Sequence, residues 1–424
     1  MKNLLFIIAA TIFSNLGFSQ KANLAKTVAG FPVNYEDDSV AAYILPDLFT
    51  TQDGQKVKDA RTWMEKRRPE IVKLFEEYQF GKIPPRPANM HFDVFDKGTD
   101  VLNGKAIRKQ VRVFFTSDTN HKMDLLIYLP KSNRPSPLLL IINFFANSSV
   151  VDDAGVKPGI VWTREGKKVA ATPTAFGKIN IDTFITQGFG IATVYYGDIE
   201  PDFKTGFKYG IRGHYLKPGQ SYPADDEWGA ISAWSWGLSR AMDYFETDKQ
   251  IDAKRIALQG TSRLGKTVLW TGARDQRFKL VIASCSGEGG AALSRRNYGE
   301  SINHMTDTSR YFYQFAANRH RYANDPNQSP VDAHMLVALM APRPLLLQTG
   351  DTDYWSDPKG EFLAAVAAEP VYKLLSKKGP GTVTMPKSGD QSLLNTLGYY
   401  MHAGGHGTIP SDWAVFITYL KKYL

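Results

Sequence analysis

The stretch RIALQGTSRLGKT, residues 255–267, joins an apolar strand candidate to a helix candidate through a glycine-bounded turn. This turn fits two incompatible chemistries. Read as G-x-x-x-x-G-K-T, residues 260–267 match the phosphate-binding P-loop pattern. Read as a serine between a strand at 255–259 and a helix from about Leu264, Ser262 has the context of the nucleophile elbow of an α/β-hydrolase. This stretch alone is therefore compatible with an NTPase and with an esterase.

Apolar runs and helical patterns alternate around this turn. Short apolar runs, typical of buried parallel strands, lie at 137–145, 189–196, 280–284 and 344–349. Helical patterns lie at 227–245, 361–377 and 411–424. This alternation predicts an α/β-hydrolase three-layer sandwich, with a mostly parallel central sheet and helices on both faces.

The N-terminal part of the chain predicts fewer regular elements. A helical pattern covers 56–80, and strand patterns cover 106–115 and 123–129. No internal repeat or interdomain linker is visible. We therefore expect residues 21–424 to form a single esterase domain, with an N-terminal extension of about 21–100.

Residues 1–20 have the composition of a secretory signal peptide. Met1-Lys2 is followed by an apolar run, Leu4–Phe13, that is too short to span a bilayer, and then by small and polar residues. This predicts a periplasmic or secreted protein without stable membrane insertion. The single cysteine, Cys285, cannot form an intramolecular disulfide. The histidines show no metal-ligand spacing, so we expect neither a metal nor a cofactor.

Charge and aromatic content narrow the choice of partners. The formal net charge is +9 and aromatic residues make up 12% of the chain. The positive excess is compatible with simple solubility or with attraction to an acidic polymer. Nucleic acid is not expected, because no basic run is interleaved with stacking aromatics. We expect the protein to be a monomer.

The hydrolase interpretation finds its other catalytic groups downstream. A serine nucleophile needs a base and an orienting acid, which follow it in that superfamily in the order acid, then histidine. An acid-rich loop at 350–358 contains Asp353, and the glycine-flanked His406 precedes the last helix. Glu288 is the alternative acid and His402 the alternative base. The P-loop interpretation is weaker, because an exported protein meets little ATP.

With those residues identified, the chain resembles the glucuronoyl esterases, carbohydrate esterase family 15. The resemblance runs from about Trp228 to Trp413, and more weakly from Trp63. The motifs that carry it are WGAISAWSWGLSRAMDYFETD (228–248), SRLGK (262–266), SGEGGAALSRRNYGE (286–300), ALMAPRPLLL (338–347) and DYWSDPKGEF (353–362).

The resemblance implies a role for each candidate residue. Ser262 would be the nucleophile and His406 the base, with Arg263 supporting the oxyanion. The sugar of a uronic acid ester would contact Lys266, Glu300 and Trp355. The substrate implied is a uronic-acid-containing polysaccharide or oligosaccharide of plant or algal cell walls, with esters of the 4-O-methyl-glucuronoyl type.

Three single positions and one short stretch depart from the family pattern. Cys285 stands where many members carry an acid, 23 positions after the serine, so Asp353 is the expected orienting acid. Thr261 replaces a common histidine, Glu288 stands where bacterial members often have cysteine, and residues 310–313 read Arg-Tyr-Phe-Tyr in place of His-Trp-Phe-Cys. A pectin methylesterase or an acetyl xylan esterase with the same triad therefore stays open, as does a non-catalytic carbohydrate-binding homologue.

Overall fold

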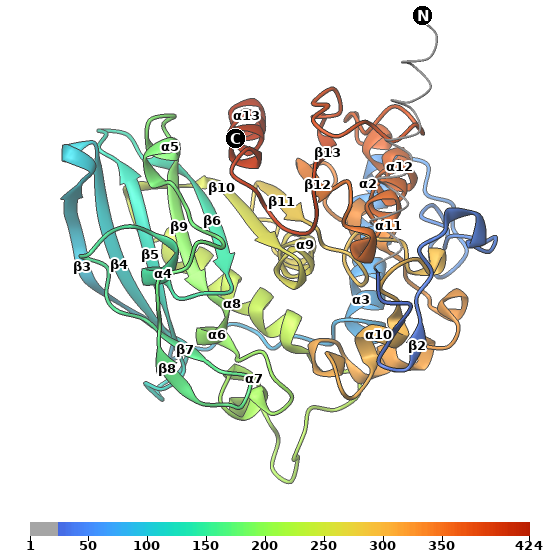
Figure 1. Ribbon diagram of the computed structural model, residues 1–424, viewed down its shortest axis with the longest axis horizontal. Coiled ribbons are helices and arrows are strands. Elements are labelled where there is room, and N and C mark those ends of the chain that lie inside the picture. The colour runs from blue at the N-terminus through green and yellow to red at the C-terminus, as the bar shows by residue number, and fades with distance from the viewer. Residues whose placement is uncertain (1–23) are drawn as a thin grey trace, which may run out of the picture.

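The computed structural model describes residues 24–424, so the predicted signal peptide lies outside the described residues. Nine strands form one sheet in the order β13-β12-β11-β10-β6-β9-β5-β4-β3 (Figure 1). The six strands from β13 to β9 pair in parallel, and the remaining strands are antiparallel. The predicted α/β-hydrolase architecture with a mostly parallel sheet is confirmed.

The parallel strands include every apolar run that was expected to form one. They are β6 (Ser136–Asn143), β9 (Gly190–Tyr195), β10 (Ile251–Thr261), β11 (Leu280–Ser284), β12 (Leu345–Gly350) and β13 (Leu397–His402). The last of these, β13, was not expected from the sequence. It follows a loop rich in glycine and proline and pairs with β12 along its whole length, from Leu345 opposite Leu397 to Gly350 opposite His402.

The antiparallel strands build the other edge of the sheet. They are β3 (His91–Val101), β4 (Ala106–Phe114) and β5 (Lys122–Pro130). The sequence predicts β4 and β5 but not β3, whose pairing with β4 is interrupted by register shifts. Strand β3 therefore extends the sheet into residues expected to belong to an N-terminal extension.

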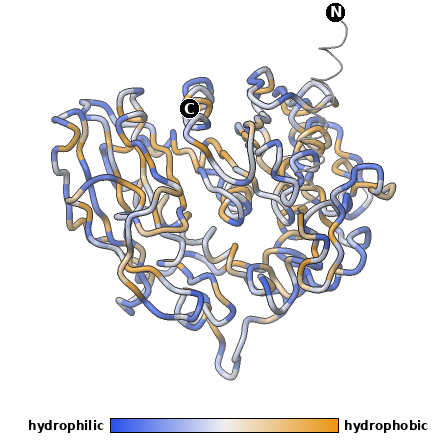
Figure 2. Tube along the Cα trace, viewed as in Figure 1, coloured by the Kyte–Doolittle hydropathy of each residue, from blue (hydrophilic) through white to orange (hydrophobic). Residues whose placement is uncertain are grey.

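Alternate residues of each central strand face opposite layers of helices. Leu138 and Leu140 of β6 pack in one apolar cluster, whereas Leu139 and Ile141 pack in the other. The first cluster is covered by α3 (Arg68–Tyr78), α8 (Ala230–Phe245), α9 (Arg263–Arg274), α11 (Ala333–Ala338) and α12 (Pro358–Leu374). The second is covered by α5 (Ile181–Ile185) and α13 (Asp412–Tyr423). Apolar segments accordingly run through the middle of the molecule (Figure 2).

The predicted helix at 56–80 begins later and is not uniform. Asp59 caps its start by accepting a hydrogen bond from the Thr62 N–H, and α2 (Ala60–Thr62) runs through a wider π-helical turn at Trp63–Arg67 into α3. Trp63, the first residue of the wider turn, is fully buried. Short elements complete the fold: β1 (Thr27–Val28), β2 (Phe31–Pro32), β7 (Ile160–Trp162), β8 (Lys168–Ala170), α4 (Asn147–Val150), α6 (Tyr196–Ile199), α7 (Ile211–His214) and α10 (Ile302–Thr306).

None of the helices between residues 24 and 424 combines the length and the apolar character that crossing a membrane requires.

Candidate active site

The carboxyl ends of four neighbouring parallel strands bring the predicted catalytic residues to one edge of the sheet. Ser262 directly follows β10 and Cys285 directly follows β11. Asp353 lies in the loop after β12, and His406 in the loop after β13. Since these strands are adjacent in the order β13-β12-β11-β10, residues far apart in sequence converge on the place where open α/β sheets bind ligands.

Ser262 sits in a strained turn between β10 and α9. Its φ of 62° and ψ of −128° are rare for a residue with a side chain. The turn is held by a 2.8 Å hydrogen bond from the Ser262 N–H to the Ser284 carbonyl. A side chain at Gly260 would come within 2.4 Å of the Leu264 carbonyl oxygen, and one at Gly265 within 2.8 Å of the Ser284 carbonyl oxygen. Both glycines are therefore required, which explains why the second stands at 265.

His406 and Asp353 form a hydrogen-bonded pair beside this turn. His406 Nδ1 lies 2.7 Å from Asp353 Oδ2, and the Ser356 hydroxyl lies 3.1 Å from the same nitrogen. The Asp353 side chain is 3% exposed and that of His406 is 41% exposed. A carboxylate at Nδ1 favours the tautomer with its proton there, which leaves Nε2 as a base. Within residues 24–424, Nε2 makes no hydrogen bond, including to Ser262.

Two further contacts tie the His406 loop to the neighbouring strands. Cys285 Sγ accepts a hydrogen bond from the Gly407 N–H at 3.3 Å and donates one to the Gly407 carbonyl at 3.4 Å. The hydroxyls of Thr261 and Thr408 lie 3.0 Å apart. Ligand-type atoms of Cys285, Asp353 and His406 lie within 4.8 Å of one another. Cys285 therefore lies beside the His406–Asp353 pair, in contact with the loop that carries His406.

The alternative acid and base are engaged elsewhere. Glu288 is buried in an ion pair with Arg319 and accepts a hydrogen bond from the Ser294 hydroxyl at 3.1 Å. Burial raises the pKa of Glu288, although the Arg319 guanidinium opposes the shift. His402 is 2% exposed, with Nδ1 2.9 Å from Asp412 Oδ2 and Nε2 3.0 Å from the Gly405 carbonyl. Neither arrangement presents a free group to Ser262.

Arg263, the expected oxyanion partner, is anchored by a residue that the sequence analysis missed. Its guanidinium pairs with Asp202, which also accepts hydrogen bonds from Tyr313 at 3.0 Å and from Gln314 at 2.7 Å. It lies over the Tyr311 ring, 4.5 Å from the centroid. Burial acts to lower the pKa of Arg263, but the Asp202 carboxylate, together with Tyr311 and Tyr196, raises it. The only signal for Asp202 in the sequence is its place in the long loop 198–226.

The three expected sugar contacts lie together near the site. The Glu300 N–H donates to the Trp355 carbonyl at 2.8 Å. Lys266, one turn into α9, is 4% exposed, and its ammonium makes no ion pair with another residue of the described chain. Burial lowers the pKa of Lys266, while the charge of Glu300 acts in the opposite direction. An amine with few partners in such a place is available to a ligand.

Arg310 was not among the expected site residues, although it begins the stretch that departs from the family pattern. Its guanidinium donates to Glu300 at 3.0 Å and lies 5.2 Å from the Trp355 ring centroid. It also lies 5.0 Å from the Tyr311 ring centroid. Arg310 therefore links the expected sugar contacts to the aromatic surface beside Arg263.

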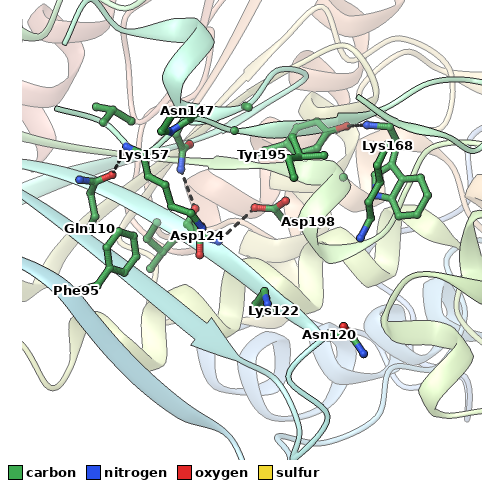
Figure 3. A pocket seen from close by; sticks show the side chains of 18 of the residues that line it. Phe95, Gln110, Asn120, Lys122, Asp124, Asn147, Lys157, Lys168, Tyr195 and Asp198 are labelled. Carbon is green, nitrogen blue, oxygen red and sulfur yellow. Dashed lines mark hydrogen bonds and ion pairs between the residues drawn. The ribbon is translucent and has the colours of Figure 1, made fainter. Parts of the chain in front are cut away.

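Two cavities adjoin the site on this side. A cleft of about 720 Å³ is lined by Arg263, Arg310 and Tyr311, and also by Trp162 and Tyr195. The last two residues separate it from a smaller pocket of about 200 Å³ (Figure 3). In that pocket the Asp198 carboxylate accepts a hydrogen bond from the Asp124 N–H at 3.2 Å. Burial, together with the Asp124 carboxylate, raises the pKa of Asp198 to about 7.

Sequence comparison relates this chain to known carbohydrate esterases. A sequence model described as glucuronyl esterase, fungi, matches residues 170–376. Carbohydrate esterase MZ0003, from an unknown prokaryotic organism, is 41% identical over 402 residues, which cover 92% of each protein. A 4-O-methyl-glucuronoyl methylesterase from Schizophyllum commune is 27% identical over 380 residues, covering 87% of this chain and 81% of that protein.

Solved structures give the same result in three dimensions. A glucuronoyl esterase from Solibacter usitatus superposes with a TM-score of 0.86 at 43% identity, covering 91% of this chain and 99% of that one. A promiscuous CE15 esterase from a marine bacterial metagenome superposes with a TM-score of 0.83 at 41% identity, covering 92% and 100%. The similarity therefore extends over nearly all of this chain, including the strand ends that carry the site.

Proposed function

Since the chain belongs to the glucuronoyl esterases of carbohydrate esterase family 15, and is thus a carboxylic ester hydrolase, we propose that it cleaves uronic acid esters in cell-wall polysaccharide. The esters are of the 4-O-methyl-glucuronoyl type. The observation that carries this proposal is the His406–Asp353 pair, which presents a free imidazole nitrogen at the sheet edge where Ser262 is held in its strained turn.

The reaction follows from what each group can do. Ser262 Oγ attacks the ester carbonyl carbon while His406 Nε2 takes the hydroxyl proton. The Asp353 carboxylate stabilises the imidazolium that forms. His406 then gives this proton to the departing alcohol, which leaves a uronoyl ester on Ser262. A water molecule, deprotonated in turn by His406, attacks that ester, and His406 returns the proton to Ser262 Oγ as the free uronate leaves.

Negative charge on the carbonyl oxygen needs fixed donors. The Arg263 N–H lies at the start of α9, where N–H groups have no partner within the helix. In this proposal the loop after β6 supplies neighbouring N–H groups, and Phe144 of that loop lines the same cleft as Arg263. The Arg263 guanidinium, held by Asp202, adds positive charge nearby without needing to reorganise.

The sugar of the esterified uronate binds beside these donors in our proposal. Lys266 supplies an ammonium to the ring hydroxyls, and Glu300 accepts hydrogen bonds from them. Trp355, which is only partly buried, offers an apolar ring face. No metal or cofactor takes part in this scheme.

One experiment tests both the substrate class and the mechanism. Methyl and benzyl esters of glucuronate and an acetylated xylooligosaccharide are compared for release of alcohol or acetate. We expect the uronate esters to be hydrolysed with the higher kcat/KM, and Ser262→Ala to abolish the reaction while the melting temperature is kept. Faster release of acetate would favour an acetyl esterase. Sugar binding without hydrolysis would favour a non-catalytic homologue.

We also propose that the protein is exported, since its N-terminal sequence has the pattern of a signal peptide and its substrate is extracellular. In this proposal residues 21–424 act as one domain and as a monomer. Size-exclusion chromatography with light scattering tests the oligomeric state, and N-terminal sequencing of the exported protein tests cleavage near Ser19 or Gln20.

A further inference from the structure

The cleft beside Arg263 carries an excess of positive charge. Four cationic residues line it: Arg164, Lys204, Arg263 and Arg310. The only carboxylate in its described lining is Asp202, which is 5% exposed and already paired with Arg263. A cleft lined by one sign of charge concentrates ligands of the opposite sign. The ligand that fits this cleft is therefore an anion.

Two of these cations have no competing partner in the protein. Lys204 is exposed and lies 5.4 Å from the centroid of the Phe312 ring, and Arg164 is also exposed. Neither makes an ion pair with a carboxylate within residues 24–424. By contrast, Arg310 is paired with Glu300 and Arg263 with Asp202. Lys204 and Arg164 are thus the two charges left for a ligand.

Aromatic side chains give the same cleft a surface suited to sugar rings. The Trp162 ring, at the end of β7, lies 5.9 Å from that of Phe203, and both residues line the cleft. The Tyr311 ring, which the Arg263 guanidinium covers, also lines the cleft. Flat apolar faces beside cations are what a charged pyranose requires, since its ring has an apolar face and its carboxylate sits at the edge.

The cleft is continuous with the proposed uronate site. Arg310 lines the cleft and contacts both Glu300 and Trp355. A glycan whose esterified uronate lies on Trp355 can therefore extend into the cleft. Beyond Trp162 the neighbouring pocket carries mixed charges, since Lys122, Lys157 and Lys168 line it together with Asp124 and Asp198 (Figure 3).

We infer that this cationic cleft is a second carbohydrate subsite, which takes a sugar bearing a free carboxylate next to the esterified unit. The preferred substrate is then a polyuronate chain with unesterified neighbours, rather than a neutral chain with one uronate branch. The inference rests on the proposed function for its placement, and concerns binding rather than the chemical step.

Binding measurements test it without requiring catalysis. The probes are an unesterified uronic acid trisaccharide and a neutral pentose trisaccharide, titrated calorimetrically at low salt. The variants are Lys204→Glu and Arg164→Glu. The control is Lys249→Glu, which makes the same charge change at an exposed lysine before β10, at the opposite end of that strand from Ser262. Thermal melts of all variants establish that they are folded.

We expect each cleft variant to weaken binding of the acidic trisaccharide by roughly threefold or more, with no effect on the neutral one. Lys249→Glu should change neither affinity, and the acidic preference should fall as salt rises. Lys266 also attracts a carboxylate, so a preference of the wild type for the acidic trisaccharide does not by itself test the inference. The test is the loss of affinity in the two cleft variants. Equal affinities of the wild type, Lys204→Glu and Arg164→Glu for the acidic trisaccharide would overturn the inference, as would an equal loss in Lys249→Glu.

Hydrolysis of the single-sugar methyl glucuronate ester separates this inference from the proposed function. If that ester is hydrolysed but the cleft variants bind normally, only the second subsite is wrong. If the variants lose acidic trisaccharide but the wild type hydrolyses no uronate ester, the subsite stands and the proposed esterase specificity is wrong.

Discussion

His402 and His406 each hydrogen-bond a buried aspartate through Nδ1, yet their surroundings differ. His402 is 2% exposed, and its Nε2 faces the Gly405 carbonyl. The His406 side chain is 41% exposed, and its Nε2 makes no hydrogen bond in the described part of the chain. The Gln348 amide nitrogen also lies 3.0 Å from His402 Nδ1, so both ring nitrogens of His402 are already occupied by protein groups. Only His406 has a nitrogen free to take a proton, which shows that a histidine–aspartate contact alone does not make a base.

The largest expected effect separates the two histidines. His406→Ala should lower kcat by roughly 10⁵-fold, because removal of a triad base disables the nucleophile, and it should leave the melting temperature nearly unchanged. His402→Ala should do the reverse, lowering the melting temperature while folded enzyme keeps most of its kcat. Steady-state kinetics and thermal melts on both variants make the comparison. Loss of activity in folded His402→Ala alone would exchange the two assignments.

The aspartate partners of the two histidines, Asp353 and Asp412, extend the same comparison with a smaller expected loss of kcat. Asp353→Asn should lower kcat by about 10³- to 10⁴-fold, since the amide cannot stabilise the imidazolium. Asp412→Asn, at a fully buried position, should instead cost about 2 kcal/mol of unfolding free energy, measured in urea. If Asp353→Asn keeps wild-type kcat, another group orients His406.

The pH dependence of the melting temperature should report the protonation of His402. The hydrogen bond to Asp412 raises the pKa of His402, with burial acting against the shift. A raised folded pKa stabilises the protein fully below the unfolded value, about 6.5, and this contribution is lost as the pH rises through the folded pKa. As the pH rises above about 6.5, the wild type should therefore lose more melting temperature than His402→Gln. Parallel curves for the two proteins would contradict a charged His402.

The smallest effect concerns the support of the catalytic loop. Cys285→Ala removes both contacts between Sγ and Gly407, so kcat should fall by roughly threefold as His406 becomes less well placed. Cys285→Ser keeps a donor and an acceptor and should restore most of that loss. A purely space-filling role would instead be indicated if serine and alanine behaved alike in kcat and differed only in stability.

Features with a local signal could be predicted from the sequence, and features set by distant contacts could not. The apolar runs predicted the parallel strands, and the glycines around Ser262 predicted the turn. The order of Ser262, Asp353 and His406 predicted which loops would meet, and the structure brings Asp353 to His406, although their catalytic roles stay predictions. Asp202 carries no motif, and its importance comes from a contact with Arg263 across 61 positions. The weakly patterned edge strands β3 and β13 were missed because their pairing, rather than their composition, defines them.

The register of the parallel strands has a consequence for how this site can change. Cys285 and Asp353 follow adjacent strands, and both side chains come within 4.8 Å of His406. We therefore expect that the carboxylate proposed to orient His406 can be moved from one strand end to the other by point substitutions. Cys285→Glu introduced into Asp353→Asn should recover part of the lost kcat. Recovery in that variant would mean that positions 285 and 353 are interchangeable sites for this carboxylate, while Ser262 and His406 stay in place.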